Sequence, residues 1–451
     1  MSARVVLLAA GKGTRMRSKL PKLLHPLGGT PMVLHALRAA VDATAARPLL
    51  VVGHGAEAMR QTVGERADFV EQIEQLGTGH AVLQARAALQ GGADLVLVSN
   101  ADLPLLTAAT LKLLLETQQA NPGPFSMLTL RQPNARGFGR VKRGAEGGVL
   151  AIIEEAEATP EELAIDELNV GAYCFRADWL WPALDKLHPS ANKGEYYLTD
   201  LLEIATAAGE RVEAVVLQDP QEAIGVNTRE HLAEAEAALR QRINRHWMLA
   251  GVTLVDPAST YIEPGVTIGQ DTVIWPNTIL QGDTHIGEDC HIGPNTVVRH
   301  SRIGNACRVE AAVVEMAVME NHVDIGPFAH LRKDTHLGDH VHMGNFGEVK
   351  NSTLGPGSKM GHFSYIGDAT IGANVNIGAG TITANYDGEN KNKTIIEDDV
   401  FIGSDTMLVA PLRIGQGART GAGAVVTKDV PARTVVVGIP ARAIRKLEEP
   451  D

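Results

Sequence analysis

The first half of the chain alternates continuous apolar runs with segments whose apolar residues recur at helical spacing. Apolar runs occur at 4–10 (RVVLLAA), 48–54 (PLLVVGH), 93–102 (ADLVLVSNAD) and 212–219 (VEAVVLQD), and helical patterns at 31–41 and 79–89. Apolar strands that alternate with helices predict a mostly parallel, Rossmann-like α/β sheet covered on both faces. Such sheets bind ligands at the carboxyl ends of their strands.

A single amphipathic pattern follows at 229–249 (REHLAEAEAALRQRINRHWML). Leu232, Leu239, Ile243 and Trp247 fall near one face of a helix, with charged residues elsewhere. We interpret this segment as a linker helix. It divides the chain into a domain at 1–228 and a second domain at 250–451.

The second domain has a repeat of six residues. Apolar residues recur six apart, with slips of one residue at Ile303, Leu354 and Ile371, at positions that include Ile262, Ile268, Ile274, Leu280, Ile286, Ile292, Val298, Ile325, Leu331, Leu337, Met343, Val349, Met360, Ile366, Ile377, Ile396, Ile402, Leu408 and Ile414. Neither a helix nor an alternating strand has this period. It is typical of a left-handed parallel β-helix of hexapeptide repeats, in which three short faces close each coil. The polar segment 381–395 is too long for one face and predicts a loop that projects from the coil.

Composition narrows the classes of function. The chain has 451 residues, a net charge of -12 and 3 cysteines. An acidic chain argues against a broad nucleic-acid surface, and no segment has the ~20 apolar residues that a membrane helix needs. Three cysteines without metal-ligand spacing are typical of reduced thiols, so we expect a cytoplasmic protein without stable membrane insertion.

A glycine loop follows the first apolar run, in LLAAGKGTRM (7–16). Small residues let the backbone approach a phosphate or a base, and free N–H groups can face an anion. Met16 stands where a dinucleotide fingerprint has its third glycine, and no Walker lysine follows. Arg15 and Lys22 place two cations beside the loop, which suits a nucleoside triphosphate.

These motifs carry a family resemblance. The glycine loop with Pro21 and Lys22 resembles the signature of sugar-1-phosphate nucleotidyltransferases, and the segments GSKMGHFSYIGDA and NIGAGTITANYDG lie in the hexapeptide region of the same chain. Together they resemble the bacterial bifunctional N-acetylglucosamine-1-phosphate uridyltransferases / glucosamine-1-phosphate acetyltransferases over nearly the whole chain. The resemblance implies acetyl transfer from acetyl-CoA to glucosamine 1-phosphate. Uridyl transfer from UTP to N-acetylglucosamine 1-phosphate then gives UDP-N-acetylglucosamine and pyrophosphate.

For the first domain, the resemblance implies one nucleotide and sugar site. Arg15 and Lys22 would hold the triphosphate, and Asp102 with Asn227 would hold Mg²⁺. Taken alone, Asp102 could equally be a strand-end turn residue. The remaining positions that match nucleotide or sugar contacts are Leu8, Ala9, Ala10, Gly11, Gln72, Gly77, Thr78, Asn100, Ala101, Gly139, Glu154 and Asn169. Relatives often have glycine where Ala101 stands.

For the second domain, the resemblance implies that His362 is the base that accepts the proton of the attacking amine, a role suited to a group that titrates near neutrality. Glu348 could orient this base or the amine. Positions that match the sugar-phosphate pocket are Arg332, Lys350, Tyr365, Asn376 and Asn385, and those that match acetyl-CoA contacts are Ala379, Asn385, Tyr386, Ser404, Ala422 and Ile439. Ile439 stands where relatives have an arginine, and Arg442 or Arg445 could substitute. The family also forms homotrimers with shared acetyl sites.

Two other functions fit parts of the sequence. One is a nucleotidyltransferase whose β-helix only oligomerises or regulates, which would need neither His362 nor the Asn385-Tyr386 loop. The other is a β-helix scaffold such as an ice-binding protein. That function needs a flat threonine array, and only Thr381 and Thr383 offer the pattern.

Overall fold

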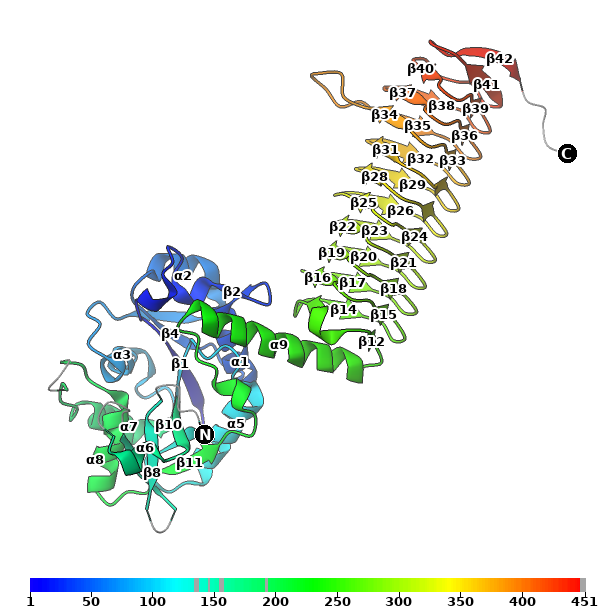
Figure 1. Cartoon of the computed structure of the whole chain (residues 1–451). Helices are drawn as coiled ribbons and strands as arrows, with labels where there is room; N and C mark the ends of the chain where they lie inside the picture. Colours follow the sequence, from blue (N-terminus) through cyan, green and yellow to red (C-terminus); the bar gives the residue numbers. More distant parts are fainter. Residues whose placement is uncertain (134–137, 145–146, 154–157, 191–193, 447–451) are drawn as a thin grey trace. The chain divides into compact units, whose positions relative to one another are not determined.

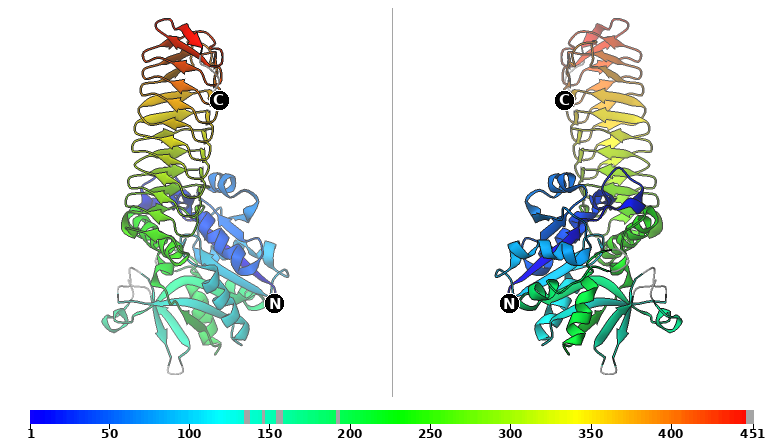
Figure 2. Two further views of the ribbon diagram at one scale, coloured as in Figure 1. Left: turned by 90° about the vertical axis from the view of Figure 1, so that its right-hand side faces the viewer. Right: turned by 90° about the vertical axis from the view of Figure 1, so that its left-hand side faces the viewer.

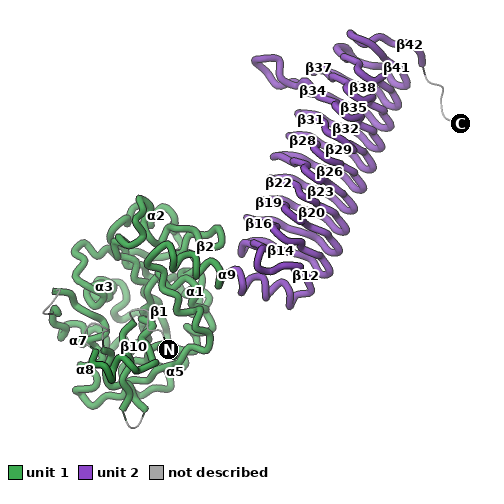
Figure 3. Tube along the Cα trace, viewed as in Figure 1, with its two compact units in different colours: residues 1–239 green, residues 240–451 purple. Residues whose placement is uncertain are grey.

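The computed structural model describes residues 1–133, 138–144, 147–153, 158–190 and 194–446. The chain divides into two compact units, Met1–Leu239 and Arg240–Asp451 (Figure 3).

A mixed sheet forms the centre of the first unit, with strand order β11-β7-β10-β6-β1-β4-β5 (Figure 1). Its strands are β1 (Ala3–Ala9), β4 (Leu49–Val52), β5 (Asp68–Glu71), β6 (Leu95–Asn100), β7 (Phe125–Arg131), β10 (Glu167–Arg176) and β11 (Glu213–Val216), with β8 (Arg140–Arg143) and β9 (Val149–Ile153) paired at the side and a separate pair β2 (Pro26–Leu27) and β3 (Thr30–Pro31). The expected strand runs therefore form β1, β4, β6 and β11, and the mostly parallel sheet is confirmed. β10 lies antiparallel to β6 and β7. Its sequence, ELNVGAYCFR, gave no continuous apolar run because Asn169 and Gly171 interrupt it.

Helices cover both faces of this sheet. They are α1 (Met32–Thr44), α2 (Ala56–Val63), α3 (Thr78–Gln84), α4 (Arg86–Leu89), α5 (Ala108–Ala120), α6 (Pro160–Leu163), α7 (Ala177–Leu184) and α8 (Leu201–Ala207), with 3₁₀ turns η1 (Thr14–Met16), η2 (Lys22–Leu24), η3 (Gly64–Arg66), η4 (Leu198–Asp200) and η5 (Pro220–Ala223). One core includes Leu37 of α1 and Leu114 of α5, and the other includes Val82 of α3 and Leu201 of α8. The segment expected as one helix at 79–89 forms α3 and α4, because Ala85 donates to Val82 at 3₁₀ spacing.

The helix α9 (Arg229–Leu249) spans the division between the units. In the first unit, Glu236 accepts a hydrogen bond from the Gly28 N–H at 2.8 Å. In the second unit, Ile243 and Trp247 pack against the core of the solenoid. The first part of this helix therefore contacts the first unit, and its last part packs on the core of the second.

Three parallel sheets form the sides of the second unit (Figure 2). Within each sheet, most strands pair with the strand that lies three places later in the chain, on the next coil. Sheet I contains β12 (Thr253–Leu254), β15 (Val273–Ile274), β18 (His291–Ile292), β21 (Arg308–Val309), β24 (Asp324–Ile325), β27 (His342–Met343), β30 (Lys359–Met360), β33 (Asn376–Ile377), β36 (Phe401–Ile402), β39 (Arg419–Thr420), β41 (Thr434–Val437) and the antiparallel β42 (Arg442–Lys446). Sheet II contains β13 (Tyr261–Ile262), β16 (Ile279–Gln281), β19 (Val297–Arg299), β22 (Val313–Glu315), β25 (His330–Leu331), β28 (Gly347–Lys350), β31 (Ser364–Gly367), β34 (Ile382–Ala384), β37 (Met407–Val409) and β40 (Val425–Val426). Sheet III contains β14 (Thr267–Ile268), β17 (His285–Ile286), β20 (Arg302–Ile303), β23 (Val318–Met319), β26 (His336–Leu337), β29 (Thr353–Leu354), β32 (Ala369–Ile371), β35 (Thr394–Ile396) and β38 (Leu412–Ile414); η6 (Pro257–Ser259) precedes β13.

The six-residue pattern is confirmed by burial. Its apolar positions, from Ile262 to Ile414, all belong to one core cluster of the solenoid. Each contributes one inward side chain per face, which stacks on its equivalents in the neighbouring coils. The projecting segment is shorter than the expected 381–395, and it lies between β34 and β35 (Figure 1). Thr383 and Thr394, near the ends of the expected segment, are buried within these strands.

Candidate functional sites

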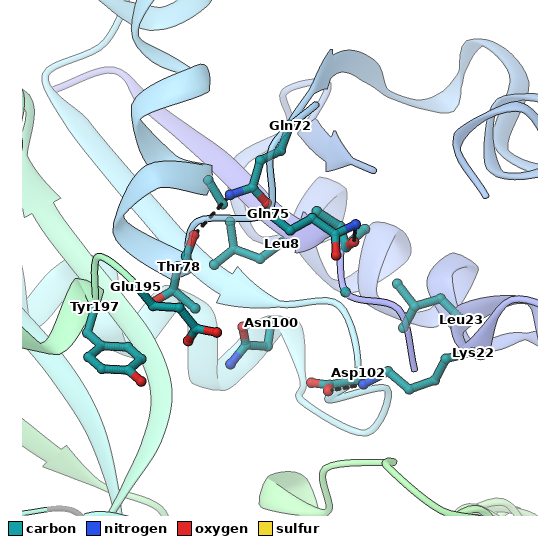
Figure 4. Close-up of a pocket in the computed structure, with 15 residues that line it drawn as sticks. Leu8, Lys22, Leu23, Gln72, Gln75, Thr78, Asn100, Asp102, Glu195 and Tyr197 are labelled. Atoms are coloured by element: carbon teal, nitrogen blue, oxygen red, sulfur yellow. Dashed lines mark hydrogen bonds and ion pairs between the residues drawn. The ribbon is translucent and has the colours of Figure 1, made fainter. Parts of the chain in front are cut away.

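A pocket of about 310 Å³ lies at the carboxyl ends of β1 and β6 (Figure 4). β1 lies between β4 and β6, so the strand order reverses at this point, where open α/β sheets bind ligands. The pocket is lined by Leu8, Ala9, Ala10, Gly11, Lys22, Leu23, Gln72, Gln75, Gly77, Thr78, Ala81, Asn100, Asp102, Glu195 and Tyr197. Ten of these are residues that the sequence assigned to nucleotide or sugar binding.

Lys22, at the edge of this pocket, contacts two polar side chains, and Figure 4 shows its contact with Asp102. Its Nζ donates to Asp102 Oδ2 at 2.6 Å and to Asn227 Oδ1 at 3.1 Å. Only 12% of the Lys22 side chain and 21% of the Asp102 side chain are exposed. The Asp102 carboxylate and the Asn227 amide oxygen therefore converge on the Lys22 ammonium, although these two residues lie 125 positions apart in the chain.

Two glycines shape the loop after β1 for different reasons. A Cβ at Gly11 would meet nothing within 4 Å, so the backbone there faces open space in the pocket. Gly13 has a φ of +61°, and a Cβ there would lie 2.6 Å from the Lys22 Cβ. Gly13 thus allows Lys22 to approach the loop, whereas Gly11 leaves room for a ligand.

Two glutamines brace the walls of the pocket. Gln75 donates from Nε2 to the Ala10 carbonyl at 2.8 Å, and the buried Gln72 donates to the Gly77 carbonyl at 3.0 Å. Gln75, Glu195 and Tyr197 were not among the sequence candidates. They come from irregular segments, and only their tertiary contacts bring them to this pocket.

The other candidates of the first unit lie nearby or outside the pocket lining. Arg15 and Asn227 line a neighbouring pocket that also includes Gly225. Ala101 is fully buried behind the loop, where its N–H donates to the Leu8 carbonyl at 3.1 Å, so it contributes no lining surface. The Gly139 carbonyl accepts from the Asn169 N–H at 2.9 Å, which joins these two candidates. Glu154 lies outside the described residues.

In the second unit, four candidates form one row at the corner between sheets I and II. His362, Ala379, Ser404 and Ala422 each lie three residues after the paired positions Lys359, Asn376, Phe401 and Arg419 of sheet I. We call these four residues the corner row. Neither ring nitrogen of the exposed His362 has a hydrogen-bond partner among the described residues. Ile439 continues this corner on the last coil, one residue beyond the equivalent of Ala422.

A second group of candidates lies on sheet II. Arg332 donates to Glu348 at 2.8 Å, and Glu348 pairs in register with Tyr365. Lys350 pairs with Gly367 at the far end of the same strands. The base of the projecting loop lies there too: Asp368 accepts from Asn351 at 2.5 Å and from the buried Asn385.

Lys391 is a cation that the sequence did not single out. It lies in the projecting loop, where its backbone forms an isolated antiparallel β-bridge with Tyr386. Lys391 holds the pKa of Lys350 below the usual value of 10.5, first through a side-chain hydrogen bond and second through its positive charge. Arg332, Lys350 and Lys391 therefore make one cationic cluster that would favour an anion.

The corner row and the cationic cluster lie at opposite edges of sheet II in one chain. His362 precedes β31, whereas Lys350 pairs with Gly367 at the end of β31. Five residues of extended chain between 362 and 367 span roughly 15 Å. A single chain thus separates the candidate base from most of the candidate anion ligands.

The described ranges contain neither a metal-ligand cluster nor a membrane-spanning helix. There is no cluster of three or more His, Cys, Asp or Glu side chains that could hold a metal ion among these residues. No helix in this part of the chain is both long and apolar enough to cross a bilayer. The three cysteines are free and buried, and burial raises the pKa of the Cys174 thiol.

Comparisons with known proteins agree with the two units. A MobA-like NTP transferase domain matches residues 5–247, a bacterial transferase hexapeptide model of six repeats matches 265–300, and a hexapeptide repeat of succinyl-transferase matches 393–428. The fold and these matches define a nucleotidyltransferase domain joined to a transferase of the hexapeptide class, so the solenoid is a left-handed parallel β-helix.

Curated relatives identify the family. The chain is 49% identical to the bifunctional protein GlmU of Heliobacterium modesticaldum over 432 residues, which cover 96% of this chain and 94% of the relative. It is 46% identical to GlmU of Exiguobacterium sibiricum over 437 residues, with 97% of both chains covered. It is 47% identical to GlmU of Pelobacter propionicus over 435 residues, which cover 96% of this chain and 95% of the relative. The chain belongs to the family of the bifunctional protein GlmU.

Proposed function

We propose that the chain is a bifunctional enzyme that makes UDP-N-acetylglucosamine in two steps. The second unit transfers acetyl from acetyl-CoA to glucosamine 1-phosphate, and the first unit transfers uridyl from UTP to N-acetylglucosamine 1-phosphate, releasing pyrophosphate. The observation that carries this proposal is the presence in one chain of a pocket with the Lys22–Asp102 pair at the switch point of an α/β sheet and of the corner row that begins with His362.

In uridyl transfer, an oxygen of the sugar phosphate attacks the α-phosphate of UTP. Such transfers depend on positioning and charge neutralisation more than on a protein nucleophile. Lys22 and Arg15 would neutralise the phosphates, with Lys22 turning from Asp102 to the nucleotide. The backbone at 8–11 and the side of the pocket formed by Gln72, Gly77 and Thr78 would contact the base and ribose.

The residues around Asp102 fit a magnesium ion. The Lys22 ammonium already lies between the oxygens of Asp102 and Asn227, which marks a position that favours a cation. Two protein oxygens suffice because Mg²⁺ usually completes its shell with phosphates and water. When bound, Mg²⁺ would stabilise the negative charge on the phosphates. Chelation of divalent ions should stop uridyl transfer and leave acetyl transfer unchanged.

In acetyl transfer, the neutral amine of glucosamine 1-phosphate attacks the thioester carbonyl and coenzyme A thiolate leaves. His362 would take the proton of the amine, since neither of its ring nitrogens has a hydrogen-bond partner in the described part of the chain. The side chains of Ala379, Ser404 and Ala422 are small, so acetyl-CoA would lie along this corner. Asn385, Tyr386 and Ile439 would be further contacts. Arg332, Lys350, Tyr365 and Asn376 would bind the sugar phosphate, and Lys391 adds to their charge.

We propose a homotrimer in which neighbouring chains complete each acetyl site. The separation of the corner row from the cationic cluster supports this assembly, because a second chain could bring its cluster to the first chain's His362. Phe328, Phe346 and Phe363 follow one another on consecutive coils beside the corner row, and each is more than half exposed. Such an exposed aromatic row is typical of an interface.

The substrates and the free thiols support a cytoplasmic location. Separate assays of the purified chain test the proposal. Acetyl-CoA with glucosamine 1-phosphate should yield free thiol and N-acetylglucosamine 1-phosphate, and UTP with N-acetylglucosamine 1-phosphate should yield pyrophosphate. Activity in the uridyl assay alone would favour a β-helix with only an oligomerising or regulatory role.

A further inference from the structure

A pair of polar residues on sheet I lies beside the segment of His362. Asp324, His342 and Lys359 are register partners on three consecutive coils, with Asn376 on the next. The His342 Nδ1 lies 2.6 Å from Asp324 Oδ1. A carboxylate oxygen can only accept, so Nδ1 carries the proton and Nε2 of the neutral ring has a free lone pair.

The orientation of His342 differs from that of the other two histidine–carboxylate pairs described on the solenoid. His330 and His336 direct Nε2 to their carboxylates, Glu315 and Glu320, at 3.2 Å and 2.8 Å. His342 uses Nδ1, so its outer nitrogen points away from the carboxylate. That nitrogen has no hydrogen-bond partner among the described residues.

The Nε2 of His342 lies near the backbone of the next coil. It lies 3.9 Å from the point that a Cβ of Gly361 would occupy, and no other atom lies within 4 Å of that point apart from those of Gly361 and its two chain neighbours. Gly361 directly precedes His362. A group that lies over Gly361 would therefore meet the Nε2 of His342, next to the residue that carries the proposed base.

We propose that His342 is a second histidine of the acetyl-acceptor subsite and accepts a hydrogen bond from the amino group of glucosamine 1-phosphate bound over Gly361. This inference rests on the proposed acetyl transfer. A neutral amine has two N–H bonds and one lone pair. His342 would accept a hydrogen bond from one N–H and His362 from the other, which directs the amine lone pair toward the thioester. Asp324 holds the His342 ring in the tautomer that this requires.

Substitutions that keep one ring nitrogen at a time test the proposal. In His342→Asn the side-chain amide replaces Nδ1 and the acceptor at Nε2 is lost, whereas His342→Gln reaches the Nε2 position with an amide oxygen. His342→Asn should raise the KM for glucosamine 1-phosphate and lower kcat/KM by about 10-fold, the usual effect of losing one such hydrogen bond. His342→Gln should recover most of this loss. His336→Asn, which breaks a similar pair on sheet III, should behave as the wild type.

Calorimetric binding to the whole protein separates a ligand contact from a structural effect. Wild-type protein should bind glucosamine 1-phosphate more tightly than glucose 1-phosphate, and His342→Asn should reduce this difference about 10-fold without weakening glucose 1-phosphate. Equal losses in the Asn and Gln variants, a loss shared by His336→Asn, or wild-type values in all three would overturn the inference. If the wild-type protein does not acetylate glucosamine 1-phosphate at all, the proposed function itself fails.

Discussion

At the scale of single residues, the first unit holds its charges ready before a substrate binds. Lys22 bridges Asp102 and Asn227, and little of either charged side chain is exposed. A buried pair of this kind keeps both charges compensated in the free protein. A bound triphosphate with its cation would give Lys22 an anionic partner in place of Asp102, and would give Asp102 a cationic partner in place of Lys22. Binding would therefore exchange one set of ion pairs for another.

Gly11 provides a test of close approach between backbone and ligand. Its φ is not in the left-handed region and a Cβ would meet nothing, so Gly11→Ala should leave the melting temperature nearly unchanged. In the complex, the added methyl would occupy space that the nucleotide needs, and uridyl transfer should fall at least about 10-fold. Steady-state kinetics with UTP and thermal melting measure the two effects. Gly92→Ala, at an exposed turn with room for a Cβ, is the matched control.

We expect Lys350 to make binding at the proposed acetyl site depend on pH. Lys391 holds the pKa of Lys350 below its usual 10.5, so Lys350 loses its proton at a lower pH than an isolated lysine does. Affinity for glucosamine 1-phosphate should therefore decline as pH rises through the range below 10.5. Lys350→Arg keeps its charge throughout that range and should flatten this decline. Calorimetric titrations at several pH values measure it, and parallel slopes in the two proteins would exclude Lys350 as the cause.

At the scale of elements, a six-residue period predicted the coils of the solenoid because each face contributes one stacked apolar residue. The inward residues from Ile262 to Ile414 could be assigned without any long-range information. The first unit was less predictable. β10 has a polar interruption at Asn169, and its antiparallel place between β6 and β7 depends on tertiary pairing.

The candidate sites show the same limit. Gly11, Lys22 and Asp102 lie at strand ends or in a recognisable loop, so local sequence pointed to them. Gln75, Glu195 and Lys391 lie in irregular segments of the chain, and only folding brings them to the other candidates. The distance between the corner row and the cationic cluster is a property of the coil width, which the motif alone does not express.

The projecting loop is an element whose position depends on one carboxylate. Asp368 accepts from Asn351 and Asn385, and it has a φ of 52°, which glycine adopts without strain. Asp368→Gly should release the base of the loop, move Lys391 away from Lys350 and weaken glucosamine 1-phosphate binding by about 5-fold or more. Asp271→Gly, at an exposed corner with a φ of 61°, should have no such effect. Unchanged affinity in folded Asp368→Gly would show that the loop needs no such anchor.

At the scale of the whole molecule, the chain joins two units with separate cores. The core residues of the sheet domain and those of the solenoid belong to different clusters, and α9 contributes to both units. Each unit can therefore keep its fold and its chemistry when the other site is altered. The solenoid has an exposed row of phenylalanines beside the corner row, at which we propose that a second chain completes the acetyl site.

The proposed assembly of the whole molecule is a homotrimer. Light scattering coupled to gel filtration should give about three times the chain mass of 48.0 kDa. Phe346→Glu would place a charge in the proposed interface, so it should lower the mass and the acetyl-transfer rate together while uridyl transfer persists. A monomer with full acetyltransferase activity would refute a site shared between chains.

The central claim is that one chain contains two independent transferase sites, and a crossed assay of two variants tests it most directly. Asp102→Asn removes a charge from the nucleotide pocket, and His362→Ala removes the proposed base. Both half-reactions are measured on each purified, folded variant. Asp102→Asn should nearly abolish uridyl transfer and keep acetyl transfer. His362→Ala should lower acetyl transfer by roughly 10²–10⁴-fold, the usual contribution of a general base, and keep uridyl transfer. Loss of both activities in either folded variant, or near wild-type acetyl transfer in His362→Ala, would contradict the two-site assignment.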